Sequence, residues 1–272
     1  GNDQDAEQAA EIIGYINQHP NITCDVGQVM FGNALSMTAD APLAYMLRGI
    51  NKNKWVNADT ECESGCGIVP FTYQGHIYTH TLQWAIGLEL FLLSENLWQV
   101  ILSTDHPNGG SFMNYPKLIR LLMDRGFRRE EIARVNQKAI ANTSIRDLDR
   151  ELSLYEIAII TRAGPARALG LKNKGHLAPG ADADLTIHDE MEDKEMMFNA
   201  PRYVFKSGVP IIADHEFRED YTGRLLHITP EYDQKIEEVI QPFFESYYSV
   251  QFENYPIDAT YMHNNEVIPT GL

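Results

Sequence analysis

The chain has 272 residues, of which 44% are hydrophobic, 10% aromatic and 22% charged, the balance of a globular protein with a substantial core. Its 38 acidic and 22 basic residues give a formal charge of -16, which argues against nucleic acid as a partner because phosphate would be repelled. No apolar run approaches the roughly 18 residues of a membrane span. The start also lacks the basic and apolar regions of a signal peptide, so we expect a cytoplasmic location.

The first part of the chain alternates predicted helices and strands. Apolar residues at helical spacing predict a helix over 5–18, and NITCDV predicts a short strand over 21–26. Residues 27–73 show no sustained period and are expected to form a functional loop system over a scaffold. The remaining predicted elements are a helix over 81–93, a strand that begins at residue 98, and helices over 115–125 and 130–140. This order is typical of parallel βα units.

The later part of the chain changes character. Ser153 and Glu156 form a capping box that starts a helix towards residue 171, which Gly164-Pro165 is expected to interrupt. From residue 175 onward, short alternating strands separated by turn residues predict an all-β annex, and a helix is expected over 234–248.

One strand end carries two ionisable residues. The run WQVILSTDHPNGG (98–110) reads as a buried strand that ends in Asp105 and His106. An aspartate before Pro-Asn-Gly-Gly is commonly a turn residue whose carboxylate bonds local amides. In a βα barrel, however, the carboxyl ends of the strands form the active-site face, so a catalytic role is the alternative. The side chain of His106 should point to the opposite face of the strand, where it either has a structural role or supports a metal ligand through a hydrogen bond.

Other candidate residues have weaker signals. The loop after residue 26 carries Gln28, Ser36 and Thr38, which either contact a substrate or only pack within the loop. The turn after Asp105 carries Asn108, Gly109 and Gly110, for which the same two roles are open. The remaining pairs and single residues are read as structural rather than as metal ligands: His76 with His80, Cys62 with Cys66, and His176, His188 and His215 in the annex.

Two segments carry a family resemblance. PARALGL (165–171) and GHLAPGADADL (175–185) resemble a helix and hairpin of the amidohydrolase superfamily, where they follow the eighth barrel strand and lead into a small β-sandwich. The resemblance implies an α/β fold: the C-terminal part of a metal-dependent (β/α)8 barrel over residues 1–172, and a β-sandwich annex with a C-terminal extension over 173–272.

Four further segments carry a more specific resemblance within that superfamily. DVGQVMFG (25–32), LSMTAD (35–40), QWAIGLEL (83–90) and LSTDHPNGG (102–110) resemble the amidohydrolase-like subunits of formylmethanofuran dehydrogenases and, more distantly, the formyltransferase/hydrolase subunits of methylotrophs. That family condenses formate with the methanofuran amine, or hydrolyses the N-formyl product, in methanogenesis and other one-carbon metabolism. It implies a binuclear zinc site in which an Asp at the end of the eighth strand is ligand and catalytic base. This Asp corresponds to Asp105.

The resemblance covers only the C-terminal half of such a subunit. Its other zinc ligands, including a histidine pair and a carboxylated lysine, would precede residue 1, so a chain or segment carrying the N-terminal barrel half is an expected partner. An isolated half barrel would expose sheet edges, which favours tight association. The family also implies subunits with a tungsten or molybdenum pterin and iron-sulfur clusters. Two alternatives stay open: a non-catalytic scaffold subunit, and a cyclic-amide hydrolase of the same superfamily.

Overall fold

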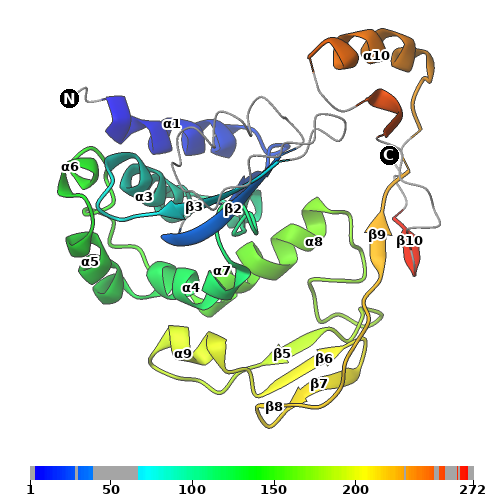
Figure 1. Cartoon of the computed structure of the whole chain (residues 1–272). Coiled ribbons are helices and arrows are strands. Elements are labelled where there is room, and N and C mark those ends of the chain that lie inside the picture. Colours follow the sequence, from blue (N-terminus) through cyan, green and yellow to red (C-terminus); the bar gives the residue numbers. More distant parts are fainter. Residues whose placement is uncertain are drawn as a thin grey trace. The chain divides into compact units, whose positions relative to one another are not determined.

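The computed structural model describes residues 4–27, 30–38, 67–229, 231–247, 251–254, 262 and 264–268 (Figure 1). The helices are α1 (Gln4–Gln18), α3 (Tyr78–Leu93), α4 (Tyr115–Met123), α5 (Arg125–Arg134), α6 (Gln137–Ile140), α7 (Leu154–Ala158), α8 (Gly164–Ala168), α9 (Lys194–Asn199) and α10 (Lys235–Tyr247). The strands are β1 (Cys24–Val26), β2 (Gly32–Thr38), β3 (Gly67–Tyr73), β4 (Val100–Leu102), β5 (Leu185–Ile187), β6 (Tyr203–Lys206), β7 (Val209–Ala213), β8 (Glu216–Phe217), β9 (Leu225–His227) and β10 (Asn265–Val267). By contacts the chain divides into two units, Gly1–Ala34 with Thr72–Tyr221, and Leu35–Phe71 with Thr222–Leu272.

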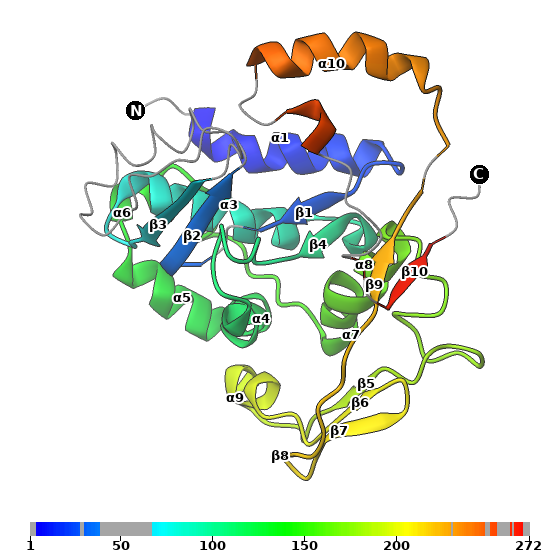
Figure 2. The same ribbon diagram turned by 45° about the vertical axis from the view of Figure 1, so that its right-hand side comes forward.

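The two predicted strands of the first unit lie side by side. β1 pairs with β4 in parallel, with Cys24 opposite Val100 and Val26 opposite Leu102 (Figure 2). The connection from β1 to β4 includes α3, as expected for a parallel crossover. Parallel pairing brings the carboxyl ends of both strands to one edge. The predicted βα organisation is therefore present, although the described strands form no closed barrel.

A buried glutamine joins the end of helix α1 to strand β4. Gln99, just before β4, is 4% exposed, and its Nε2 lies 3.0 Å from the carbonyl oxygen of Ile16 and 2.9 Å from those of His19 and Ile22. These carbonyls belong to the end of α1 and its connection to β1, where oxygens have no partner within the helix. Gln99 therefore holds the start of β1 against β4.

The core of this unit lies between the parallel pair and its helices. α3 is apolar on nearly all sides and is buried along most of its length, as expected for a helix enclosed by other elements. α1 packs on α3, and α4 contributes a buried stripe to the same cluster. The fully buried side chains of this core include Phe91, Leu88, Leu118, Leu121, Leu122, Ile140, Ile145, Ile157 and Ile160.

Several helix boundaries differ from the sequence prediction, and capping residues explain them. The helix expected over 115–125 ends at Met123, because Asp124 adopts an extended conformation and accepts a hydrogen bond from the Phe127 N–H at 2.8 Å, which starts α5. Asn136 caps α6 in the same way, so the single helix expected over 130–140 is two.

The capping box at Ser153 and Glu156 is confirmed, with both reciprocal hydrogen bonds present. The α-helix is interrupted directly before Gly164-Pro165, as expected, but by a π-helical segment, Ile159–Ala163, and not by a break in the helical path. A new α-helical segment, α8, begins at Gly164 and has Pro165 in its first turn. Proline is tolerated in a first turn because its missing N–H would have no partner there.

The annex contains one antiparallel sheet in the order β5-β6-β7-β8. Asp184 ties the loop before β5 to this sheet, because its carboxylate accepts from Lys174 Nζ at 2.7 Å, Lys206 Nζ at 2.6 Å and the Ser207 N–H at 2.9 Å. The hydrogen bonds from Lys174 and Lys206 hold the pKa of Asp184 well below its ordinary value. The annex therefore contains the predicted strands but is not all-β as predicted, because α9 lies between β5 and β6. The β-sandwich stays a prediction.

Residues 27–73 contain more regular structure than expected. β2 and β3 pair with each other within the stretch predicted as loops, and the Thr72 hydroxyl donates to Asn33 Oδ1 at 2.9 Å. The strands are separated by 28 residues of sequence, 39–66, so neither a hairpin turn nor a local period signals their pairing. In the second unit β9 pairs with β10 in parallel, and α10 confirms the helix predicted over 234–248.

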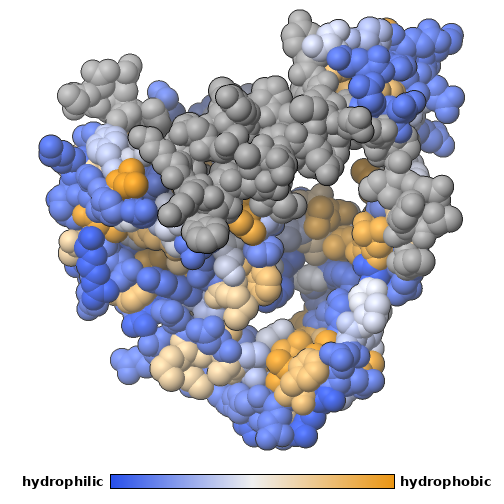
Figure 3. Space-filling model, in the orientation of Figure 1, coloured by the Kyte–Doolittle hydropathy of each residue, from blue (hydrophilic) through white to orange (hydrophobic). Residues whose placement is uncertain are grey.

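The visible surface is mainly hydrophilic, in keeping with the high content of charged residues (Figure 3). Apolar groups interrupt it over the antiparallel sheet, where Ile187 is 46% exposed and Phe217 64% exposed (Figure 3). Within the described ranges, no helix combines the length and apolar character that crossing a bilayer requires.

One buried carboxyl group gives a stability prediction. Glu89 on α3 is 1% exposed, and burial raises its pKa from 4.5 to about 7, although the backbone N–H of Ser144 donates to its Oε1. The folded protein thus binds more protons than the unfolded chain between about pH 4.5 and 7, so the free energy of unfolding falls as the pH rises through this window.

We therefore expect Glu89→Gln to stabilise the protein at pH 8 by up to about 3 kcal/mol and to change little at pH 4.5, since glutamine mimics the protonated acid. Amide hydrogen exchange of residues 141–150 at both pH values, corrected for intrinsic rates, measures this. Glu95→Gln, at an exposed carboxyl, is the matched control. A Glu89→Gln variant that is equally destabilised at both pH values would contradict the prediction.

Candidate functional site

The carboxyl ends of β1 and β4 bring polar residues together. The Ser103 N–H donates to the Val26 carbonyl at 3.3 Å, which continues the parallel pairing one residue beyond β4. Asp25 and Gly27 from one strand therefore lie at the same edge as Ser103 and Asp105 from the other. In α/β proteins this edge is where ligands bind, because chain turns there leave side chains and backbone groups open.

Asp105 stands in a constrained turn. Its φ is +47°, a left-handed conformation that costs a non-glycine residue roughly 1 to 3 kcal/mol. Two hydrogen bonds hold its backbone: its N–H donates to Ser103 Oγ at 2.9 Å, and its carbonyl accepts from the Gly109 N–H at 2.9 Å. Its side chain is exposed, and no described residue donates a hydrogen bond to its carboxylate. The backbone, and not the carboxylate, thus makes the local turn bonds.

Gly27 leaves the space that Asp105 occupies. A Cβ atom added at Gly27 would lie 2.6 Å from Asp105 Cβ and 3.3 Å from its backbone nitrogen. Carbon atoms in contact are normally about 3.5 to 4.0 Å apart, so any side chain at residue 27 would displace Asp105. The close approach of β1 to the Asp105 turn therefore requires glycine at this position.

Ionisable neighbours surround this edge. Partial desolvation and the negative charge of Asp105 raise the pKa of Asp25, although a hydrogen bond from the Ser103 hydroxyl lowers it. Burial and the charge of Asp105 also raise the pKa of Tyr73, at the end of β3, and burial with the charge of Asp25 raises that of Tyr115. The electrostatic character of the edge is negative, as a cation-binding carboxylate site requires.

The other residues predicted around Asp105 take varied positions. His106 is exposed, with Nδ1 3.3 Å from the Gly110 carbonyl and its ring edge-on to Phe112 at 4.9 Å, so it supports the loop. Gly109 is buried and bonds Asp105, and Asn108 is half-buried. Ser36 and Thr38 lie on β2, but their side chains, like all of Gln28, Cys62 and Cys66, fall outside the described residues.

The remaining histidines make local contacts. His80 lies in the first turn of α3, although the sequence placed it before the helix, and its Nδ1 accepts from the Gln74 N–H at 3.0 Å. In the annex, His176 Nε2 lies 2.8 Å from the Lys172 carbonyl, His188 Nδ1 lies 2.8 Å from that of Met197, and His215 pairs with Asp189. These contacts fit the structural roles expected for them.

Sequence reasoning missed Asp25, Gly27, Ser103 and Tyr73 as neighbours of Asp105, and Tyr115 as a neighbour of Asp25. A signal was available for two of them. Asp25 lies at the end of the predicted strand 21–26 and Gly27 follows it directly, and the rule that drew attention to Asp105 applies equally to the end of an adjacent parallel strand. Tyr73 could not be placed, because the pairing of β2 and β3 was not foreseen.

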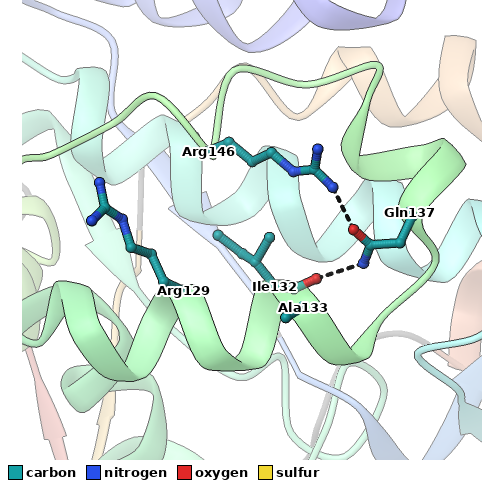
Figure 4. Close-up of a pocket in the computed structure, with 5 residues that line it drawn as sticks. All are labelled: Arg129, Ile132, Ala133, Gln137 and Arg146. Carbon is teal, nitrogen blue, oxygen red and sulfur yellow. Dashed lines mark hydrogen bonds between the residues drawn. The ribbon is translucent and has the colours of Figure 1, made fainter.

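A second feature lies elsewhere on the same unit. An open pocket of about 350 Å³ is lined by Arg129, Ile132, Ala133, Gln137 and Arg146 on α5, α6 and the following segment (Figure 4). Arg146 donates to Gln137 Oε1 across it, while Gln137 Nε2 donates to the Ile132 carbonyl at 2.8 Å (Figure 4). Its lining contains no acid, thiol or histidine, so it offers no catalytic chemistry of the predicted kind.

The carboxylates at the ends of β1 and β4 can contribute ligands to a metal site, but they are too few to complete one. No group of three or more potential ligands occurs among the described residues. A catalytic zinc site needs three protein ligands, and carboxylate oxygen is an accepted one. The exposed carboxylate of Asp105, close to the acidic Asp25, fits a site whose other ligands lie outside the described part of this chain.

Comparison with known proteins agrees with this geometry. Residues 4–212 match the amidohydrolase family, and the chain belongs to that family. The protein FwdA of Methanocaldococcus jannaschii is 40% identical over 273 residues, covering 96% of this chain and 48% of the relative. The FhcA subunit of the formyltransferase/hydrolase complex of Methylorubrum extorquens is 39% identical over 258 residues, covering 94% of this chain and 47% of the relative.

A solved structure has the same fold. The crystal structure of the formyltransferase/hydrolase complex FhcABCD from Methylorubrum extorquens, in complex with methylofuran, matches with a TM-score of 0.80 and 35% identity, over 96% of this chain and 49% of that chain. The α/β amidohydrolase-type fold is thereby confirmed. The chain spans about half the length of the relatives that it matches.

Proposed function

We propose that this chain forms part of a formyl-transferring amidohydrolase subunit, which interconverts an N-formyl amide of a furan-type one-carbon carrier with formate and the free amine. The carrier class is methanofuran or a related compound such as the methylofuran bound to the solved relative. The observation that carries the proposal is the exposed carboxylate of Asp105, which makes none of the local bonds of a turn aspartate and stands where two parallel strands end. The family membership and both named relatives support it.

In this proposal Asp105 moves the proton. Its carboxylate accepts a proton from water as the water oxygen attacks the formyl carbon, and it returns that proton to the nitrogen as the carbon–nitrogen bond breaks. Formate and the amine are released, and the reverse sequence condenses them. Asp105 would also hold a binuclear zinc centre through a carboxylate oxygen, and the metal, when bound, would polarise the formyl oxygen and stabilise the negative charge that develops on it.

The proposal includes further parts of an enzyme complex. The remaining zinc ligands come from the N-terminal half of the barrel, on this or another chain, and residues 1–172 complete that barrel while 173–272 form the annex. Formate is supplied or consumed by partner subunits, which in a dehydrogenase version carry iron-sulfur clusters and a tungsten or molybdenum pterin. The FhcABCD relative is itself a multisubunit complex, which supports partners of this kind.

A substrate comparison tests the proposed activity. The purified complex that contains this chain should hydrolyse N-formylmethanofuran or its methylofuran counterpart and should leave a cyclic amide such as a dihydropyrimidine unchanged. Release of formate and of free amine in equal amounts measures the reaction. Preferential hydrolysis of the cyclic amide would favour the other amidohydrolase class, and a complex inactive on both, with zinc present, would favour a scaffold role.

A further inference from the structure

One stretch of the first unit is basic, although the chain as a whole is strongly acidic. Residues 125–146 carry six basic and two acidic side chains, whereas the full sequence has 38 acidic and 22 basic ones. This stretch comprises α5, α6 and the segment that follows them. A local excess of positive charge on a negatively charged protein attracts anionic groups to that place and not to the rest of the surface.

The buried arginine of this stretch has a structural role. Arg128 is 1% exposed, and its guanidinium donates to the carbonyl oxygens of Leu121, Leu148 and Arg150 at 2.8 to 3.0 Å. It therefore stabilises the end of α4 and the segment before α7. Among the described contacts, the exposed cations of the same stretch make no comparable bonds to main-chain carbonyls, so support of the fold does not explain them.

Two of the exposed cations stand at the open pocket of about 350 Å³. Figure 4 shows the Ile132 side chain between Arg129 and the pair formed by Arg146 and Gln137. Arg129 lies 3.0 Å from Asp149, a carboxylate that a second arginine also contacts. Arg146 donates to the neutral Gln137 oxygen, and no described acidic side chain pairs with it. The positive charge at the pocket is therefore only partly neutralised within the described part of the chain.

These groups define the chemistry of a ligand. A guanidinium binds a carboxylate through two parallel hydrogen bonds, and Ile132 with Ala133 offers contact to an apolar side chain. A small molecule usually has roughly 70 to 90% of its surface buried in its site, which an open pocket does not provide, whereas side chains that project from another protein can enter it. Nucleic acid is disfavoured, because the net charge of -16 repels phosphate over the rest of the surface.

We propose that this pocket is the docking site for an acidic segment of another subunit, in which Asp or Glu side chains flank an apolar residue. Arg129 and Arg146 bind the carboxylates, and the apolar residue covers Ile132 and Ala133. The inference rests on the part of the proposed function that places the chain in a multisubunit complex, which the FhcABCD relative supports, and not on the role of Asp105.

Lys138 provides a direct chemical test. It is exposed, it follows Gln137 in α6, and no described carboxylate pairs with it. A water-soluble carbodiimide joins a lysine amine to a carboxylate that lies against it. Treatment of the purified complex, followed by mass spectrometry, should therefore identify an Asp or Glu of another subunit linked to Lys138. In the double variant Arg129→Gln with Arg146→Gln, the yield of this link should fall at least about tenfold, because the carboxylates lose their charged partners.

A photo-reactive residue at the apolar part of the pocket gives an independent measurement. Ala133 lines the pocket and is exposed, so p-benzoylphenylalanine in its place should couple on irradiation to the same segment that Lys138 identifies. Arg202→Gln with Arg218→Gln is the matched control for the arginine variant. It removes the same charge from two annex arginines whose side chains are 46% and 48% exposed, and it should leave both yields unchanged.

Several results would overturn the inference. They are links from both positions only to this chain, to the N-terminal barrel half or to nucleic acid, links to a segment without acidic residues, and a yield that the loss of Arg129 and Arg146 leaves unchanged. Absence of any link at either position, while other lysines of the chain are linked, would also overturn it. Formate release by the same complex reports separately on the proposed function, so a failure of one is distinguishable from a failure of the other.

Discussion

Replacing Asp105 by asparagine in the assembled complex is expected to lower the rate of formyl-amide turnover by at least about a hundredfold, the usual scale for losing a general base. Asparagine cannot accept and return the proton, although its shape is nearly the same. The fold should survive, because asparagine adopts the left-handed conformation of Asp105 more readily than most residues and both backbone hydrogen bonds remain available.

Single-turnover and steady-state rates of formate release, measured with equal zinc content in both proteins, give the result. His176→Asn is the control, because this annex histidine bonds nearby backbone groups of the chain, Lys172 and Ala178, and should leave the rate unchanged. A fully assembled Asp105→Asn complex with near-normal turnover would return Asp105 to the role of a turn residue.

Gly27→Ala is expected to have the second-largest effect, a loss of roughly tenfold to a hundredfold in kcat, since small displacements of catalytic groups have costs on this scale. The added methyl group would meet Asp105 Cβ at 2.6 Å, so Asp105 or β1 must move. The change introduces no charge or polar group, so the measured effect reports on position alone. The measurement is kcat for formate release, together with the thermal stability of the complex.

Gly14→Ala on α1 provides the control for this substitution. An added Cβ there meets no atom within 4 Å, and alanine in a helix interior is favoured over glycine by roughly 0.5 to 1 kcal/mol. This variant should be as active as the wild type and slightly more stable. Wild-type activity in Gly27→Ala would show that the close approach of Gly27 to Asp105 has no effect on kcat.

Local patterns were sufficient to predict much of the first unit. The apolar spacing in residues 5–18 predicted α1, the capping box at Ser153 marked α7, and the apolar runs before Gly27 and Asp105 predicted β1 and β4. Each of these signals depends on neighbours within a few residues. The strands β6 and β7 were predictable for the same reason, because they alternate and the two turn residues Ser207 and Gly208 join them. The helix α9, between β5 and β6, was not predicted.

Features that depend on distant pairing could not be predicted in this way. The close approach of Gly27 to Asp105 exists only because β1 and β4 pair in one register, with Val26 opposite Leu102. A shift by one residue would direct Asp25 to the other face of the sheet. The pairing of β2 with β3 likewise joins segments far apart in sequence, and the sequence contains no turn signal for it.

Anomalous scattering at the zinc edge, from crystals of the assembled complex, tests most directly whether Asp105 belongs to a metal centre. We expect a zinc peak at about 2.0 to 2.2 Å from a carboxylate oxygen of Asp105, the usual zinc–carboxylate distance. A zinc centre in the complex with no peak beside Asp105, or an Asp105 carboxylate turned into the amides of its own loop, would contradict this role.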